Sequence, residues 1–170
     1  MNRLLQYLQT SRYLAIAIAL ASAVILSAAY ISQYGFGLKP CILCLYQRGP
    51  YALNIALGFM AFLASFRYPR LTKLIIYLAA VSFLADAVIA GFHVGVEHGW
   101  WKGLPSCGGD IVPHGSIEEM RRSLENQAIV RCDKPAWTMF GISMAGYNFI
   151  IALMLAGSVT YLLRKKNHGA

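Results

Sequence analysis

The sequence predicts an all-α membrane protein: a four-transmembrane-helix bundle with a long outer loop that contains a short interfacial helix. Apolar residues make up 58% of the 170 residues, more than the share typical of soluble domains. Three long stretches, residues 13–38, 49–66 and 135–163, carry no charge, and a fourth, residues 74–96, contains only Asp86. Because a helix needs about 20 apolar residues to cross a bilayer, each stretch accounts for one crossing.

These crossings follow one another along the chain, and residues 1–170 are expected to form a single integral membrane domain. In lipid the backbone must satisfy its own hydrogen bonds, so each crossing is expected to be helical. The first is longer than the core of a signal peptide and is therefore expected to stay uncleaved. The predicted spans are residues 14–34, 42–66, 74–94 and 140–163.

The connections between the spans differ in length and polarity. A link with two glycines and Pro40 joins the first two spans, and a basic turn, residues 67–73, joins the second and third. A polar loop, about residues 95–137, precedes the fourth span. Within it, residues 116–119 (Ser-Ile-Glu-Glu) have capping-box spacing, and the apolar stripe that continues to residue 128 predicts a short helix on the membrane surface.

The distribution of lysine and arginine predicts the orientation in the membrane. The terminal segments and the basic turn contain eight of these residues and no acid, whereas the long loop contains five of them together with six acids. Because cytoplasmic segments carry the excess of basic residues, both termini are expected in the cytoplasm and the loop outside. This asymmetry accounts for the net charge of +8, so no nucleic-acid partner is expected. The eight basic residues are Arg3, Arg12, Arg67, Arg70, Lys73, Arg164, Lys165 and Lys166.

All four cysteines, Cys41, Cys44, Cys107 and Cys132, fall on the outer side in this topology, where disulfides can persist. Three pairings are possible, and proximity in the chain favours Cys41 with Cys44 and Cys107 with Cys132. The loop pair could be a structural staple worth about 3 kcal/mol. Its glycine-rich and charged flanks instead predict an exposed disulfide in a mobile loop, outside any buried core and suited to thiol exchange.

The segment KPCILCLYQR, residues 39–48, places Cys41, Cys44 and Arg48 on one face of a helix that begins just after Pro40. A thiol at a helix amino terminus has a lowered pKa. Arg48 could support a thiolate or hold a polar oxygen of a ligand. Snorkelling of Arg48 toward the membrane surface is the alternative, although a charge inside a span is a functional candidate by default.

Other polar residues at the outer end are candidates for a ligand site. His93 and His98 lie at the level expected for Cys44, and either could line a pocket. No metal site is predicted, because structural zinc sites show several close ligand pairs and only one is present. Asp86 is either functional or a polar tether to Asn54, Asn148 or a tyrosine. Trp100, Trp101 and Trp137 are expected to anchor the chain at the membrane boundary.

Residues 39–48, the four spans and the second outer cysteine pair together resemble the DsbB family of bacterial quinone-linked disulfide oxidoreductases. The resemblance implies a multi-pass enzyme of the bacterial inner membrane, with both termini cytoplasmic and the redox cysteines periplasmic. It also implies that the protein reoxidises a soluble thioredoxin-fold oxidase (DsbA-like) and passes the electrons to a quinone, either ubiquinone or menaquinone. The glycines around Cys107 differ from the best-known members, which leaves open a general or a dedicated partner.

The resemblance also implies a role for each site residue. Cys107 would receive the partner's thiolate, and Cys132 would then attack Cys41 and release Cys44 toward the quinone, with Arg48 holding a ring oxygen. His98 would be the second quinone contact, with His93 as its substitute.

Two other classes of function remain open at this stage. A non-catalytic, disulfide-stapled membrane subunit could bind a metal or a transport partner. A protein resembling vitamin K epoxide reductase would run the electrons in reverse, but that family places its Cys-x-x-Cys pair on the last span, whereas here the pair opens the second.

Overall fold

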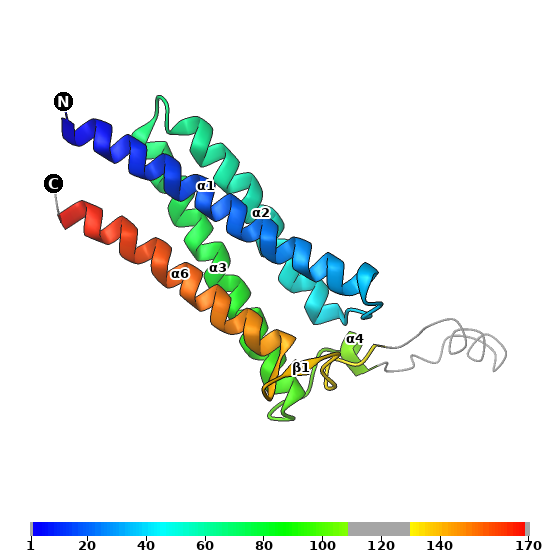
Figure 1. The fold of residues 1–170 in the computed structure, drawn as a ribbon. Helices are drawn as coiled ribbons and strands as arrows, with labels where there is room; N and C mark the ends of the chain where they lie inside the picture. Colours follow the sequence, from blue (N-terminus) through cyan, green and yellow to red (C-terminus); the bar gives the residue numbers. More distant parts are fainter. Residues whose placement is uncertain (1, 109–129, 169–170) are drawn as a thin grey trace, which may run out of the picture.

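The computed structural model describes residues 2–108 and 130–168, and Figure 1 shows four long helices running side by side. These are α1 (Asn2–Tyr30), α2 (Ile42–Ala64), α3 (Pro69–Glu97) and α6 (Met144–His168). α1 continues into the π-helical turn η1 (Ile31–Gly35). The bundle is the predicted all-α architecture.

Short elements lie at the end of the bundle opposite to the chain termini (Figure 1). They are the helix α4 (Pro105–Gly108) and two antiparallel strands, β1 (Thr138–Met139) and β2 (Ile142–Ser143). α2 also begins at this end, so the predicted separation of the termini from the helix-mouth cysteines is present. The predicted interfacial helix, residues 116–128, lies outside the described residues.

Within the described residues, three helices are long and apolar enough to cross a membrane, and their candidate spans are Ser11–Gly35, Pro69–Glu97 and Met144–Arg164. The first of them continues into η1, and the other two contain most or all of the spans expected from the sequence. α2 coincides with the predicted second span but stays outside this group, because Gln47, Arg48 and Asn54 lower its mean hydropathy. A crossing by α2 therefore stays a prediction.

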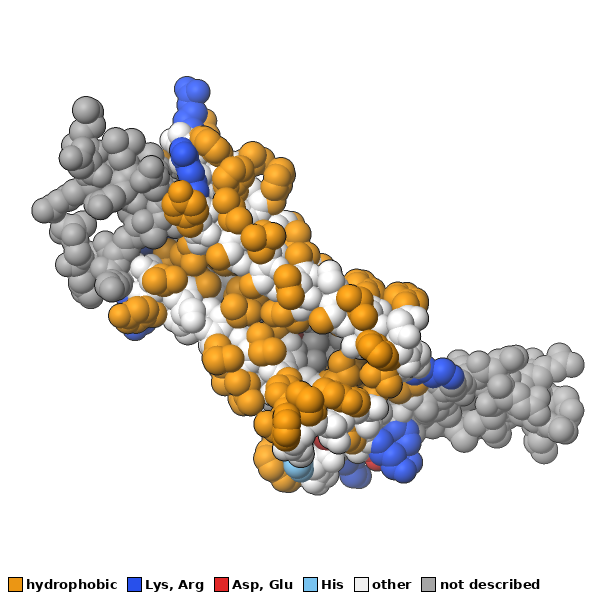
Figure 2. All heavy atoms as spheres, viewed as in Figure 1, with side chains coloured by type: hydrophobic (Ala, Val, Ile, Leu, Met, Phe, Trp, Pro, Cys, Tyr) orange, Lys and Arg blue, Asp and Glu red, His pale blue; other side chains and the backbone are white. Residues whose placement is uncertain are grey.

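The helices pack through small residues and turn large apolar residues outward. Among the residues described, alanine is the most frequent residue of the main buried core, and Tyr51, Ile76 and Phe83 are among its larger members. The outer surface of the bundle is covered with apolar side chains (Figure 2), including Leu20, Val24, Phe59, Val88 and Met154. Small residues inside and large apolar residues outside are the pattern of a helical bundle surrounded by lipid.

α1 and α2 approach each other closely at Gly58. A Cβ atom at this position would lie 2.8 Å from the carbonyl oxygen of Ala15 and 2.9 Å from the Cβ of Ala19. The absence of a side chain therefore sets how near α1 comes to α2, and α2 carries the residues of the site.

We expect Gly58→Ala to lower the thermal stability of the full chain in detergent micelles, because α1 and α2 must separate to admit the new carbon. Overpacking of this kind costs about 1–3 kcal/mol. Gly157→Ala is the matched control, since its Cβ would meet no atom within 4 Å and alanine favours the helix. Equal melting temperatures for the two variants would contradict the close approach.

Candidate functional site

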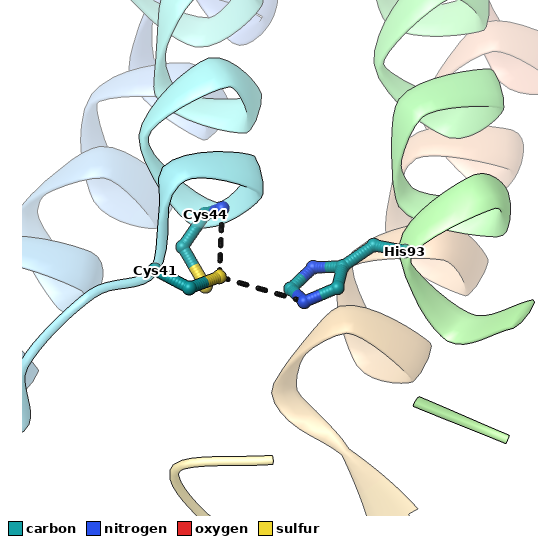
Figure 3. Close-up of side chains that lie close together, drawn as sticks. All are labelled: Cys41, Cys44 and His93. Carbon is teal, nitrogen blue, oxygen red and sulfur yellow. Dashed lines mark hydrogen bonds between the residues drawn. The ribbon is translucent and has the colours of Figure 1, made fainter. Parts of the chain in front are cut away.

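Cys41 and Cys44 stand at the amino terminus of α2, as the motif predicted. Cys41 is the N-cap residue, and its Sγ accepts a hydrogen bond from the backbone N–H of Cys44 at 3.3 Å. The two sulfurs are 2.8 Å apart, and both cysteines are free thiols (Figure 3). Cys41 is buried and Cys44 is partly exposed, so the two sulfurs face different surroundings.

The pKa of the Cys41 thiol is lowered to about 4. The largest cause is the hydrogen bond from the Cys44 thiol, and burial opposes it by raising the pKa. His93 and the backbone N–H of Cys44 lower the pKa further. Cys41 is therefore the sulfur that holds negative charge in the reduced pair.

The second pair is the disulfide between Cys107 and Cys132, which confirms the predicted pairing. The expectation that this disulfide is exposed was wrong, because Cys107 is 4% and Cys132 is 0% exposed. Both sulfurs pack in one apolar cluster with Cys41 and with Val96 from the end of α3. Gly103 makes room for this packing, since a Cβ there would lie 3.1 Å from the side chains of Cys107 and Val96.

The cluster brings the two cysteine pairs together from segments far apart in the chain. Cys41 belongs to the start of α2, whereas Cys107 belongs to α4 and Cys132 lies near the end of the long loop. Thiol–disulfide exchange requires one sulfur to reach another directly. The loop disulfide and Cys41 of the helix-mouth pair are therefore neighbours in the structure.

Cys44 also borders a cavity of about 340 Å³ between α1, α2 and α6. Arg48 lines the same cavity one turn further along α2, and most of the wall is apolar. Cys41 is not among the residues that line it. Its other lining residues include Leu26, Gln33, Pro40, Trp137, Met144 and Ile151.

The Arg48 side chain contacts η1 and the end of α1. Its Nη1 donates a hydrogen bond to Oε1 of Gln33 at 2.6 Å, and its Cζ lies 4.9 Å from the ring centroid of Tyr30. These contacts keep the guanidinium at the cavity wall. A polar group of a ligand in the cavity could take its remaining hydrogens.

The two predicted histidines occupy different positions. His93 is buried beside the thiols, with Nε2 3.5 Å from the Sγ of Cys41 (Figure 3). His98 caps the end of α3, is exposed, and stacks on Trp100 with ring centroids 5.2 Å apart. Neither residue lines the cavity, so a quinone contact by His98 stays a prediction. His114 lies outside the described residues.

Motif reasoning missed Gln47 as a site residue. Its side chain is buried, accepts a hydrogen bond from Asn148 at 3.1 Å and contacts Nδ1 of His93 at 3.1 Å. The tether of Asp86 to Asn148, one of the alternatives predicted, is present at 3.0 Å. A polar residue in an apolar segment was the available signal for Gln47, but its partners come from α3 and α6.

An apolar-surfaced helical bundle that brings a dithiol against a disulfide defines a membrane thiol–disulfide oxidoreductase. The family model described as "Disulfide bond formation protein DsbB" matches residues 11–162. This chain belongs to the DsbB family, whose role is disulfide oxidoreduction.

Curated relatives agree with this assignment. A "Disulfide bond formation protein B" of Verminephrobacter eiseniae is 32% identical over 95% of this chain and 91% of its own length. One of Acinetobacter baumannii is 29% identical over 81% of this chain and 82% of its own. An uncharacterised protein of Rickettsia prowazekii is 31% identical over 91% of this chain and 90% of its own. No solved structure matches the chain.

In protein with the Cys41–Cys44 pair reduced, we expect ultraviolet thiolate absorbance to be lost only as the pH falls through about 4. Cys44→Ala removes the largest cause of the lowered pKa, so the loss should move to a higher pH. Cys41→Ala is the control and should abolish the low-pH step. A step that survives in Cys41→Ala would assign the charge to another sulfur.

Proposed function

We propose that the protein reoxidises a soluble, periplasmic thioredoxin-fold dithiol oxidase and passes the electrons through its two cysteine pairs to a membrane quinone. One observation carries the proposal: the helix-mouth pair lies between the loop disulfide and an apolar cavity. Cys41 packs in the cluster with the loop disulfide, and Cys44 borders an apolar cavity together with Arg48.

The cavity residues fit a quinone. The wall is mostly apolar, as a ligand that partitions into lipid requires, and the guanidinium of Arg48 can donate to a ring oxygen. Cys44 supplies a sulfur at the same wall. When bound there, a quinone would accept two electrons and two protons.

The cysteines transfer the electron pair by successive exchanges. A partner thiolate attacks Cys107, breaks the Cys107–Cys132 bond, and forms a mixed disulfide while Cys132 leaves as a thiolate. Cys132 attacks Cys41 of the oxidised helix-mouth pair and releases Cys44 as a thiolate. The partner's second thiolate then closes the partner's disulfide and frees Cys107.

Cys107 completes the sequence by attacking the bond between Cys132 and Cys41. This step restores the loop disulfide and releases Cys41, whose lowered pKa makes it a good leaving group. The partner has lost two electrons and the helix-mouth pair holds them. A loop disulfide beside two free thiols, as found here, corresponds to this product state.

The proposal includes α2 as a fourth crossing and places the termini in the cytoplasm. Burial supports the crossing, because two of the three polar residues that lower the hydropathy of α2, Gln47 and Asn54, are 8% and 0% exposed, and the third, Arg48, lines the cavity. Polar side chains turned into a bundle do not face lipid. The basic residues of the termini and the α2–α3 turn support the orientation in the bacterial inner membrane.

We expect Arg48→Ala to reduce quinone-dependent oxidation of a reduced thioredoxin-fold dithiol by at least about tenfold, the loss expected for a charged hydrogen bond to a ligand. Arg67→Ala, in the turn between α2 and α3, is the matched control and should keep wild-type turnover. Melting curves of both variants show whether the fold persists. An unchanged rate in a folded Arg48→Ala protein would favour the non-catalytic membrane subunit.

If Cys107 is the entry point, Cys132→Ser should accumulate a mixed disulfide between Cys107 and an oxidised partner, because the free Cys107 thiolate opens the partner's disulfide, the partner's second sulfur leaves as a thiolate, and no Cys132 thiol remains to attack the new bond. Mass spectrometry of the trapped complex identifies the joined cysteines. Cys107→Ser should trap no such species through Cys107. A partner found attached only to Cys41 would reverse the proposed order.

A further inference from the structure

A line of hydrogen-bonded polar side chains, all but Asn148 buried, runs from the middle of α3 to the sulfur of Cys41. Nδ2 of Asn148 lies 3.0 Å from Oδ2 of Asp86 and 3.1 Å from Oε1 of Gln47. Nε2 of Gln47 lies 3.1 Å from Nδ1 of His93, and Nε2 of His93 lies 3.5 Å from Sγ of Cys41. The line joins three helices, α3, α6 and α2, before it reaches the thiol.

The carboxylate of Asp86, at one end of the line, determines which group donates in each hydrogen bond. A carboxylate only accepts hydrogen bonds, so the amide nitrogen of Asn148 must face Asp86. The second hydrogen of that nitrogen is then donated to Gln47. Tyr51 donates its hydroxyl hydrogen to Oδ1 of Asn148 at 2.6 Å, which agrees with this orientation.

The orientation of the Asn148 amide determines that of Gln47, and Gln47 in turn determines the tautomer of His93. The oxygen of Gln47 accepts from Asn148, so its nitrogen is left to donate to Nδ1 of His93. A ring nitrogen that accepts carries no hydrogen, so in neutral His93 the hydrogen stands on Nε2. Nε2 faces Cys41, and Oε1 of Glu97 lies 3.8 Å away on the same side.

Burial keeps water from competing with these directions. Asp86 is 0%, His93 is 3% and Gln47 is 8% exposed. Asn148 is partly buried and, like Gln47, lines the cavity. Turning either amide would set two oxygens, or two N–H groups, against each other within the line.

We propose that Asp86, acting through the two side-chain amides, keeps the ring hydrogen of His93 on Nε2, where it is donated to the sulfur of Cys41. His93 is thus a hydrogen-bond donor to a reacting atom, and Asp86 is a positioning residue. The significance of this arrangement rests on the proposed function, in which Cys41 is the last leaving group. A donor aimed at that sulfur supports the departing thiolate.

The same hydrogen argues against a metal at this position. Sulfurs of Cys41 and Cys44 and a ring nitrogen of His93 lie within 4.8 Å of one another, which could suit a metal ion. A ligating nitrogen needs a free lone pair, however, and Nε2 is the nitrogen that carries the hydrogen. The network thus favours His93 as a hydrogen-bond donor to the Cys41 thiolate and disfavours it as a metal ligand.

Two other titratable groups face Cys41 and His93 within the described part of the chain. Cys44 of α2 contacts Cys41, and Glu97 of α3 lies beside His93 and accepts a hydrogen bond from the Ser143 hydroxyl. The disulfide packed against Cys41 does not titrate. Glu97 reinforces the assignment, because a carboxylate favours an N–H over a lone pair at Nε2.

Nitrogen-15 NMR of histidine-labelled full-length protein in detergent micelles, with the Cys41–Cys44 pair reduced, reads the tautomer directly. The His93 signals are those that disappear in His93→Gln. We expect Nε2 protonated and Nδ1 unprotonated in the wild type. Gln47→Glu replaces the donor with an acceptor and should move a hydrogen to Nδ1. A wild-type His93 protonated on Nδ1 would overturn the proposal.

Substitutions of Asp86 test the remote end of the line. Asp86→Leu removes the acceptor and should produce a mixture of tautomers, whereas Asp86→Asn retains an acceptor oxygen and should keep the wild-type tautomer. Ser82→Ala is the matched control, because Ser82 is a buried polar residue one turn away that donates to the carbonyl of Pro50 and lies outside the line. It should change nothing.

The thiolate absorbance of Cys41 completes the test. In Asp86→Leu the midpoint of its loss should rise by about one pH unit, the shift expected for one weakened hydrogen bond to a thiolate. An unchanged tautomer and midpoint in folded Asp86→Leu would overturn the proposal. If that variant fails to fold, the His93 tautomers of the wild type and of Gln47→Glu, measured by NMR, test the proposal instead. These measurements need neither quinone nor partner, so they remain valid if Arg48→Ala disproves the proposed function.

Discussion

The polar side of α2 can exist only because α1, α3 and α6 cover it. In an apolar bundle, Gln47, Arg48 and Asn54 would be costly if they faced lipid, and the fold turns them toward the interior or the cavity. Small residues make this cover tight, as at Gly58, where the backbones of α1 and α2 nearly touch. The site chemistry depends on this closure, because buried hydrogen bonds keep fixed directions that water would otherwise scramble.

A single helical turn separates two chemically different sulfurs. Cys41 caps α2 and lies among buried side chains of α3 and the loop, whereas Cys44 points toward the cavity. A dithiol with one sulfur on each side can exchange with a protein disulfide and still supply electrons to a lipid-soluble acceptor. The position of the Cys-x-x-Cys motif at the start of α2 therefore brings the sites of the two proposed reactions, disulfide exchange and electron transfer to the acceptor, next to each other.

Much of this arrangement could be predicted from residues 39–48 and from the apolar stretches. Local patterning determines helix positions, and a Cys-x-x-Cys after Pro40 indicates a helix amino terminus whatever surrounds it. The Cys107–Cys132 pairing followed from proximity in the chain. Its burial did not, because the loop flanks are polar and the covering residues, Cys41 and Val96, come from two distant helices.

The sequence by itself determined the number and place of the long helices, the thiol pair at a helix mouth and the charge asymmetry of the chain, because these depend on local composition and spacing. Only the tertiary structure decided which polar residues meet. In the structure His93, and not His98, lies beside the Cys41 thiol, and Asn148 is the hydrogen-bond partner of Asp86. Such choices depend on the rotation and register of helices about their axes, and no local pattern encodes these when nearly every face of a helix is apolar.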